Sequence, residues 1–466
     1  PRSVPIVLDG TVLAVTFATS VVSGLVFGLT PALQLRGDSI TQPASAAGHR
    51  ITSSRARQNV RRGLVVAQVA MAVVLLAGAG ITVRSFVRLS GVELGFDPRN
   101  VITFELEPPE KAPYATNADL YAFYDRVRDR LGALEGVVGV TWAQGTPPLQ
   151  RHPTWQPVDP GVSGSTVQKG GYLDYGQLVG AAYFETLGMA VLEGRTFDAR
   201  DTLASEPVIV VNQTMARRFW PEGSAVGQVF ASNTFKEAFH HREYRVVGVV
   251  ADAKQGSPEQ PTGAEVYWPY SQVKPAPAGA PRMHSHVAFL VRVEGDARCR
   301  MQALQREVQA LDPQLPIVHL STFDNVLWHS VARPRFLTTL LVALAVLALL
   351  MAAVGIYGVT THAVQQRTQE LGIRLALGAP PRRVLELVLR QGLTLSAMGI
   401  LLGIAAAVAL ALSMRRAFAT MLFEGASLDA LTVGALALVI AFISMAASYV
   451  PALRATRIPP TMAMRG

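Results

Sequence analysis

Charged residues are missing from five long stretches of the sequence, each at least 21 residues long and dominated by apolar side chains. A helix needs roughly 20 apolar residues to cross the hydrocarbon core of a bilayer, and a charge at its centre costs about 2.5–3.5 kcal/mol on insertion scales. Buried helices of a soluble protein are the alternative, which this combination of length and missing charge disfavours. The pattern therefore predicts five membrane-spanning helices, at Thr11–Leu35, Gly63–Val83, Phe336–Gln366, Gln391–Met414 and Ala430–Leu453.

The positive charge of the chain is concentrated beside the predicted spans. The net charge is +9, yet Arg84–Arg335, between the second and third spans, holds 25 basic and 27 acidic residues. The excess lies in Arg36–Arg62, in Arg367–Arg390 and in the tail from Arg454. Cytoplasmic loops are enriched in Lys and Arg near span ends, so these segments are predicted to face the cytoplasm and Arg84–Arg335 to lie outside it. The basicity reports topology and excludes a nucleic-acid partner as its explanation.

A short motif occurs twice at the cytoplasmic end of a predicted span. Pro31-Ala32-Leu33 closes the first span and Pro451-Ala452-Leu453 closes the last, and basic residues follow both. We therefore predict that the first span closes an earlier copy of the same unit, and that the chain is a piece of a duplicated protein. The predicted parts are a closing helix of the preceding copy (1–36), a flexible basic cytoplasmic linker (37–62), a transmembrane helix (63–84), an outer domain (85–335), and three transmembrane helices with a short cytoplasmic helix at 367–379 (336–466).

The outer domain combines strand and helix patterns, which predicts an α+β domain of two lobes. Alternating or β-branched apolar runs indicate strands, and one apolar face at a spacing of three and four residues indicates a helix. The sole cysteine, Cys299, lies in this domain and leaves no internal disulfide to form. The predicted strands are Val101–Leu106, Pro207–Val211, Tyr244–Val250 and His286–Val293, and the predicted helices are Asp119–Leu134 and Arg300–Leu311.

The cytoplasmic segment after the third span has the composition of a short amphipathic helix. Glu370 and Arg374 stand four residues apart in the favourable order, worth a few tenths of a kcal/mol. Gly378 suits a left-handed helix end, and two prolines follow it. The segment carries more apolar side chains than a solvated loop would. We expect it to dock on the membrane surface or on a cytoplasmic partner.

Several motifs together resemble the MacB-like permeases of the FtsX superfamily of ABC transporters, over nearly the whole chain. In the cytoplasmic segment the resemblance rests on the run Gln366–Ala379. Beside the second span it rests on Ala67-Gln68-Val69-Ala70, Arg84-Ser85-Phe86 and Gly95-Phe96-Asp97-Pro98. In the outer domain and the tail it rests on Tyr183–Met189, Gly194–Phe197, Val211–Pro221, Val247–Val250, Pro451–Ala455 and Pro459-Pro460. The first copy departs from the family at Leu35-Arg36-Gly37-Asp38, where a basic, Pro-containing ending is usual.

This resemblance implies a permease that relays the closure of a separate cytoplasmic ABC ATPase to the outer domain by mechanotransmission, for efflux or export. It also implies a bacterial inner-membrane location, a second permease unit as homodimer partner or preceding repeat, contact with membrane lipid, and a possible periplasmic adaptor. The resemblance identifies the ATPase-coupling residues as Arg367, Glu370, Leu371, Gly372, Ile373, Arg374, Leu377, Gly378 and Ala379.

Other kinds of site find little support in the sequence. No phosphate-binding loop of the Gly-x-x-x-x-Gly-Lys-Ser/Thr type occurs, and His362 is the sole ionisable residue inside a span. His240-His241 and His284-x-His286 are predicted to be surface histidines rather than a metal site, and no cofactor is predicted. Gly399-x-x-x-Gly403 permits close helix packing, and Gly24-x-x-x-Gly28 does the same. The aromatic run Tyr267–Tyr270 is predicted to be packed rather than exposed.

Three hypotheses of function remain at this point. The first is a permease driven by an ATPase partner, and the second is an ATPase-free membrane scaffold or sensor with an extracytoplasmic binding domain. The third, a tethered extracytoplasmic enzyme, requires a catalytic cluster that the sequence does not contain. The chain is therefore predicted not to be an enzyme.

Overall fold

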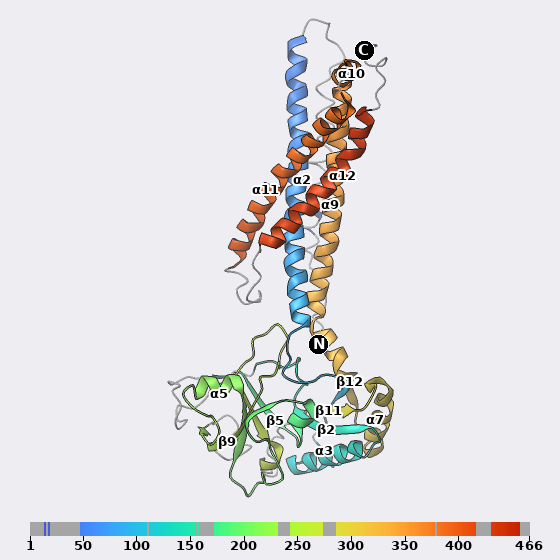
Figure 1. The fold of residues 1–466 in the computed structure, drawn as a ribbon. Coiled ribbons are helices and arrows are strands. Elements are labelled where there is room, and N and C mark those ends of the chain that lie inside the picture. The colour runs from blue at the N-terminus through green and yellow to red at the C-terminus, as the bar shows by residue number, and fades with distance from the viewer. Residues whose placement is uncertain are drawn as a thin grey trace.

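The computed structural model describes residues 47–109, 111–153, 156–157, 172–231, 243–273, 286–377, 380–415 and 430–456, together with positions 14, 17 and 18. Within these residues a bundle of long helices stands on a mixed sheet domain (Figure 1). The predicted first span and Gly24-x-x-x-Gly28 fall almost entirely outside the described residues.

Four helices of the bundle are long and apolar enough to span a membrane, as predicted for the last four spans. Their apolar segments run over Asn59–Leu89, Pro334–Gln366, Pro381–Ser413 and Gly434–Thr456. The charged residues within these ranges, such as Arg61, Arg84 and Arg454, lie toward the helix ends, because an ionised side chain is costly in hydrocarbon. The complete helices are α2 (Ala47–Ser90), α9 (Ala332–Gln366), α11 (Pro381–Arg415) and α12 (Ala430–Thr456).

The flexible linker predicted at 37–62 is wrong for residues 47–62, which are helical and form the start of α2. This stretch contains no Pro, and five of its residues are Arg, a good helix former. Adding a residue to an existing helix also costs far less than starting a new one. The apolar span therefore extends backwards as one continuous helix.

The bundle is held together by close packing of α2 against α9 and α11. Its core contains Val65, Val69 and Val73 of α2, with Ile356 of α9 and Ile440 of α12. The close approach predicted at Gly399-x-x-x-Gly403 is confirmed, since both glycines of α11 lie directly against the backbone or Cβ atoms of α2.

The outer domain contains one sheet in the order β12-β1-β11-β2-β5-β10-β7-β9-β6, with β8 paired to β9. A separate small ladder joins β3 and β4. The strands are β1 (Val101–Leu106), β2 (Val137–Gln144), β3 (Gln156–Pro157), β4 (Tyr172–Leu173), β5 (Tyr175–Val179), β6 (Val191–Gly194), β7 (Val208–Asn212), β8 (Val229–Ala231), β9 (Glu243–Val250), β10 (Glu265–Pro269), β11 (Val287–Val293) and β12 (Ile317–Thr322). All four predicted strands are present, with ends shifted by at most one residue.

Two halves of the sheet meet at a narrow connection. The ladder between β2 and β5 consists of one residue pair, Ala143 with Val179. On one side of it α3 (Asn117–Gly132) and α7 (Ala297–Leu311) pack against β1, β2, β11 and β12. On the other side α5 (Gln213–Phe219) packs against β7, β9 and β10. This arrangement supports the two-lobed description.

Aromatic and aliphatic side chains fill the core as the sequence pattern predicts. Leu120, Phe123, Val127 and Leu131 line the buried face of α3, whose start is capped by Thr116 with Asp119. Tyr267 and Trp268 are fully buried in β10, which confirms the prediction that the aromatic run is packed. The remaining elements are α4 (Tyr183–Leu187), a 3-10 turn at Tyr270–Gln272, α8 (Phe323–Ser330) and α10 (Thr368–Ala376).

Candidate functional site

The predicted cytoplasmic helix is present as α10, at the end of the bundle away from the sheet domain (Figure 1). It begins one residue later than predicted, because Arg367 is the C-cap of α9. The Arg367 N–H donates to the Val364 carbonyl at 3.1 Å. The Arg367 carbonyl then accepts from the Leu371 N–H at 2.9 Å, which starts the new helix. Gly378 and Ala379 lie outside the described residues.

One face of α10 is seated on the ends of two spanning helices. Leu371 is only 2% exposed and forms a cluster with Val384 and Val388 of α11 and with Ala452 and Ala455 of α12. Gly372 is buried beside it. Apolar burial of this kind stabilises by roughly 25 cal/mol per Å² removed from water. Moving α10 away from the ends of α11 and α12 would therefore expose this apolar surface to water, which is unfavourable.

The opposite face of α10 is exposed and carries both charged and apolar groups. Glu370 and Arg374 form an ion pair at 2.6 Å with both side chains about half exposed, and Arg367 is also exposed. Ile373 is 48% exposed and Leu377 is 83% exposed. A surface ion pair of this kind is worth little by itself. Two large apolar side chains beside it give the face the character of a contact surface.

The sequence reasoning missed the residues that seat α10. Val384 and Val388 sit on α11, which follows α10 in the chain, whereas Ala452 and Ala455 sit on α12, which is distant in sequence. The repeated Pro-Ala-Leu motif was the available signal, because Ala452 is its middle residue. A sequence repeat alone does not tell which helix packs against it.

At the other end of the bundle, two connections to the outer domain meet. Phe96 follows α2 and Phe323 begins α8, which leads into α9, and their rings contact edge to face at 5.3 Å between centroids. Both rings are buried in the same core cluster. The segment after α2 is also fixed at Gly95 (φ +78°), where a Cβ would lie 1.8 Å from the Asp252 carbonyl oxygen.

Arg292 of β11 fastens this junction through backbone carbonyls. Its guanidinium donates to Thr186 at 2.6 Å, to Asp97 at 2.8 Å and to Arg99 at 3.0 Å. Because the side chain is largely buried, losing it would leave three acceptors without their donor.

We expect Arg292→Met to destabilise the outer domain by about 2 kcal/mol or more, because the carbonyls of Thr186 and Asp97 are part-buried and an unpaired buried acceptor costs about 1–3 kcal/mol. Denaturant unfolding of the chain in detergent, followed by tryptophan fluorescence, measures this. Arg130→Met is the matched control, since Arg130 makes an exposed ion pair with Glu307 and should cost less than about 1 kcal/mol. Equal losses of stability in the two variants would contradict the role of Arg292 in holding this junction.

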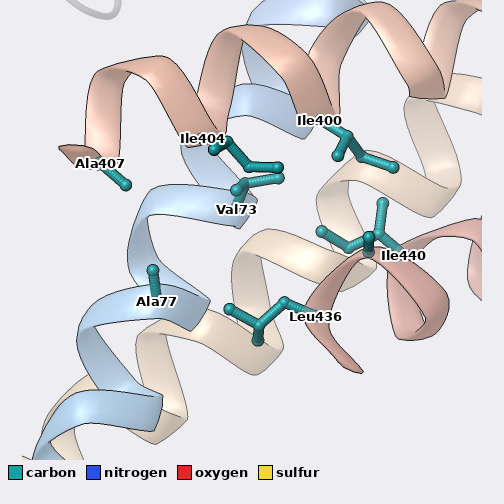
Figure 2. Close-up of a pocket in the computed structure, with 8 residues that line it drawn as sticks. Val73, Ala77, Ile400, Ile404, Ala407, Leu436 and Ile440 are labelled. Atoms are coloured by element: carbon teal, nitrogen blue, oxygen red, sulfur yellow. The ribbon is translucent and has the colours of Figure 1, made fainter. Parts of the chain in front are cut away.

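Among the described residues, a pocket in the bundle is lined by aliphatic side chains alone (Figure 2). Val73 and Ala77 of α2 face Ile400 and Ile404 of α11 across it, and Leu436 belongs to α12. Such a lining offers no hydrogen bond to a polar solute. It therefore does not provide a polar path through the bundle.

Of the four histidines considered for a metal, the structure describes His286 alone. His286 Nε2 and His319 Nδ1 each lie 3.0 Å from the same oxygen of Glu105, Oε2. Both imidazole rings thus point at a carboxylate oxygen rather than at a common position where a metal ion would bind. Accordingly, the described ranges contain no group of three or more His, Cys, Asp or Glu side chains suited to a metal ion.

His319 joins edge strand β12 to Glu105 of β1. His286, just before β11, contacts the same carboxyl group, and this second contact depends on pH. Hydrogen bonding to Glu105 is the main cause that raises the pKa of His286 above its ordinary 6.5, with Glu107 adding to the rise and burial and Arg151 opposing it. Burial raises the pKa of Glu105, but the hydrogen bonds from His286 and His319 outweigh it and hold that pKa below the ordinary 4.5.

We expect the contact between His286, just before β11, and Glu105 of β1 to stabilise the outer domain best between these two ordinary pKa values. The His286 contribution is complete below 6.5 and is lost as pH rises through its raised pKa. The Glu105 contribution is present above 4.5 and is lost as pH falls through its lowered pKa. Hydrogen exchange of β1 and β11, corrected for the intrinsic effect of pH, measures this. His286→Ala should flatten the profile, the exposed His329→Ala should not, and a flat wild-type profile would refute it.

Comparison with known proteins shows that two protein-family models match this chain. The model of the MacB-like periplasmic core domain matches residues 11–311, and that of the FtsX-like permease C-terminal region matches residues 342–460. The macrolide export ATP-binding/permease protein MacB 1/2 of Paracoccus denitrificans is 26% identical over 323 residues, which cover 68% of this chain and 46% of the relative. The pyoverdine export ATP-binding/permease protein PvdT of Pseudomonas putida is 28% identical over 287 residues, covering 60% and 41%.

The chain thus spans less than half the length of these two relatives. Among solved structures, the periplasmic region of MacB from Actinobacillus actinomycetemcomitans overlaps 50% of this chain and 92% of its own. The identity is 17% and the TM-score is 0.32. An overlap at that score carries no argument about the arrangement of the domain.

Proposed function

Because this chain belongs to the MacB-like permeases of the FtsX superfamily, we propose that it is the membrane subunit of an exporter driven by a separate cytoplasmic ATPase. The two relatives named above are ATP-binding/permease proteins for export. This chain contains no phosphate-binding loop, so the proposal assigns ATP hydrolysis to a partner and force transmission to the chain. It is not itself an enzyme in this scheme.

The observation that carries the proposal is the two-faced structure of α10. Leu371 anchors its inner face to α11 and α12, while Ile373 and Leu377 remain exposed on the outer face. A cytoplasmic protein that pressed on the outer face would move the ends of α11 and α12 with it. The exposed ion pair Glu370–Arg374 would add charge complementarity to that contact.

The proposed relay then runs through the bundle to the outer domain. Close packing joins α11 to α2 at Gly399 and Gly403, and α2 enters the outer domain beside Phe96 and Phe323. A rigid shift of packed helices is a known form of conformational coupling. The aliphatic lining of the bundle pocket supports a relay rather than a polar channel.

We further propose a bacterial inner-membrane location with the outer domain in the periplasm. A second permease unit, either another copy or a preceding repeat, would complete the transporter, and a periplasmic adaptor would receive the exported compound. The export substrate is a small compound, peptide or lipoprotein segment that the outer domain meets in the periplasm.

Purification of the chain from its native membranes, followed by mass spectrometry, tests the proposal. We expect an ABC ATPase among the partners and ATP hydrolysis by the purified complex. An ATPase that co-purifies with wild type but is lost from Glu370→Lys supports docking at α10. Recovery of the intact chain with no nucleotide-binding partner would instead favour the ATPase-free scaffold or sensor.

A further inference from the structure

A buried polar cluster lies in the outer domain, far from α10 and unused by the proposed relay. Its first member, Arg151, lies in the loop that follows β2, and its backbone N–H donates to the Gln255 carbonyl at 2.9 Å. Part of the Arg151 residue reaches the surface, while its Nε and Nη2 atoms are covered. The loop thus places a guanidinium group at the edge of the domain core.

Gln255 connects this loop to the sheet. Its side-chain amide donates to Glu265 Oε2 of β10 at 3.1 Å, and its Oε1 accepts from Gln177 Nε2 of β5 at 2.8 Å. The Tyr183 hydroxyl donates to Gln177 Oε1 at 3.3 Å. Gln177, Gln255, Glu265 and Tyr183 are all nearly inaccessible to solvent. The cluster is therefore a set of buried side chains joined by hydrogen bonds rather than a flexible surface group.

Three polar atoms of the cluster have no hydrogen-bond partner within the part of the chain that the structure describes. They are Nε and Nη2 of Arg151 and Oε1 of Glu265, which is only 1% exposed. Nε and Nη2 form one edge of the guanidinium, the edge whose two parallel N–H groups match the two oxygens of a carboxylate. An unsatisfied buried donor or acceptor costs about 1–3 kcal/mol, and more when it is charged.

The charge balance of the cluster leaves a positive charge to be matched. Burial raises the pKa of Glu265 to about 8, against the lowering effects of Tyr267, Arg151 and Gln255, so its carboxyl group is mainly neutral at neutral pH. Burial also lowers the pKa of Arg151, but a guanidinium keeps its proton in proteins. The other ionisable groups facing this pair are Tyr175, Tyr183, Tyr267, Asp252 and His286.

We propose that this cluster is a binding site for a small carboxylate-bearing solute in the outer domain. The ligand carboxylate would accept from Arg151 Nε and Nη2, and Glu265 Oε1 would bond a neighbouring polar group of the same molecule. Access is from the surface beside Arg151, where part of that residue is exposed. The site goes beyond the proposed ATPase coupling and does not depend on it.

Calorimetric titration of the full chain in detergent with N-acetylglycine tests the site, with N-acetylglycine methyl ester as the uncharged counterpart. We expect saturable binding of the acid and none of the ester. Arg151→Lys keeps a charge but lacks the paired donors, so it should bind about tenfold or more weakly. Arg245→Gln is the matched control, because Arg245 pairs with Glu206 on the exposed side of the same lobe, and it should bind as wild type does.

A pH series provides a second readout that does not rely on removing Arg151. As pH rises through about 8, Glu265 ionises and supplies Arg151 with an internal counter-charge, so binding should weaken. Glu265→Gln keeps the shape and cannot ionise, so it should bind at neutral pH and lose this pH dependence. Absence of saturable binding in wild type would show that no such solute occupies the cluster. Equal affinity in Arg151→Lys would show that the acid binds elsewhere, and either result would overturn the site.

Discussion

Replacing Ile373 and Leu377 together with Asp is expected to abolish binding of the ATPase partner while the chain remains folded. Both side chains project from the exposed face of α10 and add nothing to its buried seat. An interface that covered them would bury two carboxylates without counter-charges, a cost of several kcal/mol for each. A loss of about 4 kcal/mol or more is a thousandfold decrease in affinity. Co-purification and ATPase activity in reconstituted membranes measure the loss.

The controls separate a lost contact from lost folding. Leu203→Asp makes the same kind of change at an exposed apolar residue of the outer domain and should leave ATPase binding unchanged. Leu371→Ala removes the anchor of α10 instead and should weaken both the fold and the binding, by about 2–5 kcal/mol in stability. Normal ATPase binding by a folded Ile373→Asp, Leu377→Asp double variant would exclude the exposed face as the docking surface.

The spanning helices could be predicted from sequence because the bilayer fixes both their length and their composition. The four described spans lie where charge is missing, and α10 lies where an amphipathic pattern interrupts the basic loop. The linker was mispredicted because polar composition was taken as a sign of flexibility. Residues 47–62 are polar, but they contain no Pro, five of them are Arg, and they are joined directly to a stable helix.

The seat of α10 and the polar cluster could not be predicted, for a different reason. Leu371 finds its partners on α11 and α12. Arg151 comes near Glu265 because the loop after β2 is bonded to Gln255, which in turn bonds Glu265. Local periodicity defines which face of an element is apolar. It does not define strand order or helix pairing, which depend on contacts between distant parts of the chain. For the same reason the strands were predicted individually, but the order of the sheet was not.

Enlarging Gly399 and Gly403 is expected to separate α11 from α2 and to destroy the relay. A Cβ at Gly403 would lie 2.6 Å from the Val73 Cβ and 2.8 Å from the Ala70 carbonyl oxygen, and a Cβ at Gly399 would lie 2.6 Å from the Val69 Cβ. These atoms belong to the helix itself or are attached to it directly, so no rotamer change relieves the overlap. Gly403→Ala should cost about 1–3 kcal/mol, and leucine at both positions should prevent stable assembly of the bundle.

Gly434→Ala on α12 and Gly78→Ala on α2 are the matched controls, because no neighbouring atom lies within 4 Å of a Cβ at either position. Since Ala favours helix over Gly by about 1 kcal/mol, these variants should be neutral or slightly stabilised. Thermal unfolding in detergent, together with the distance between spin labels on α2 and α11, measures the effect. The relay requires Gly403→Ala to lose ATPase stimulation by export substrate even at temperatures where the bundle is folded. A Gly403→Ala variant with unchanged helix separation would show that α11 does not press directly on α2, and the proposed route to the outer domain would then have to pass through α9.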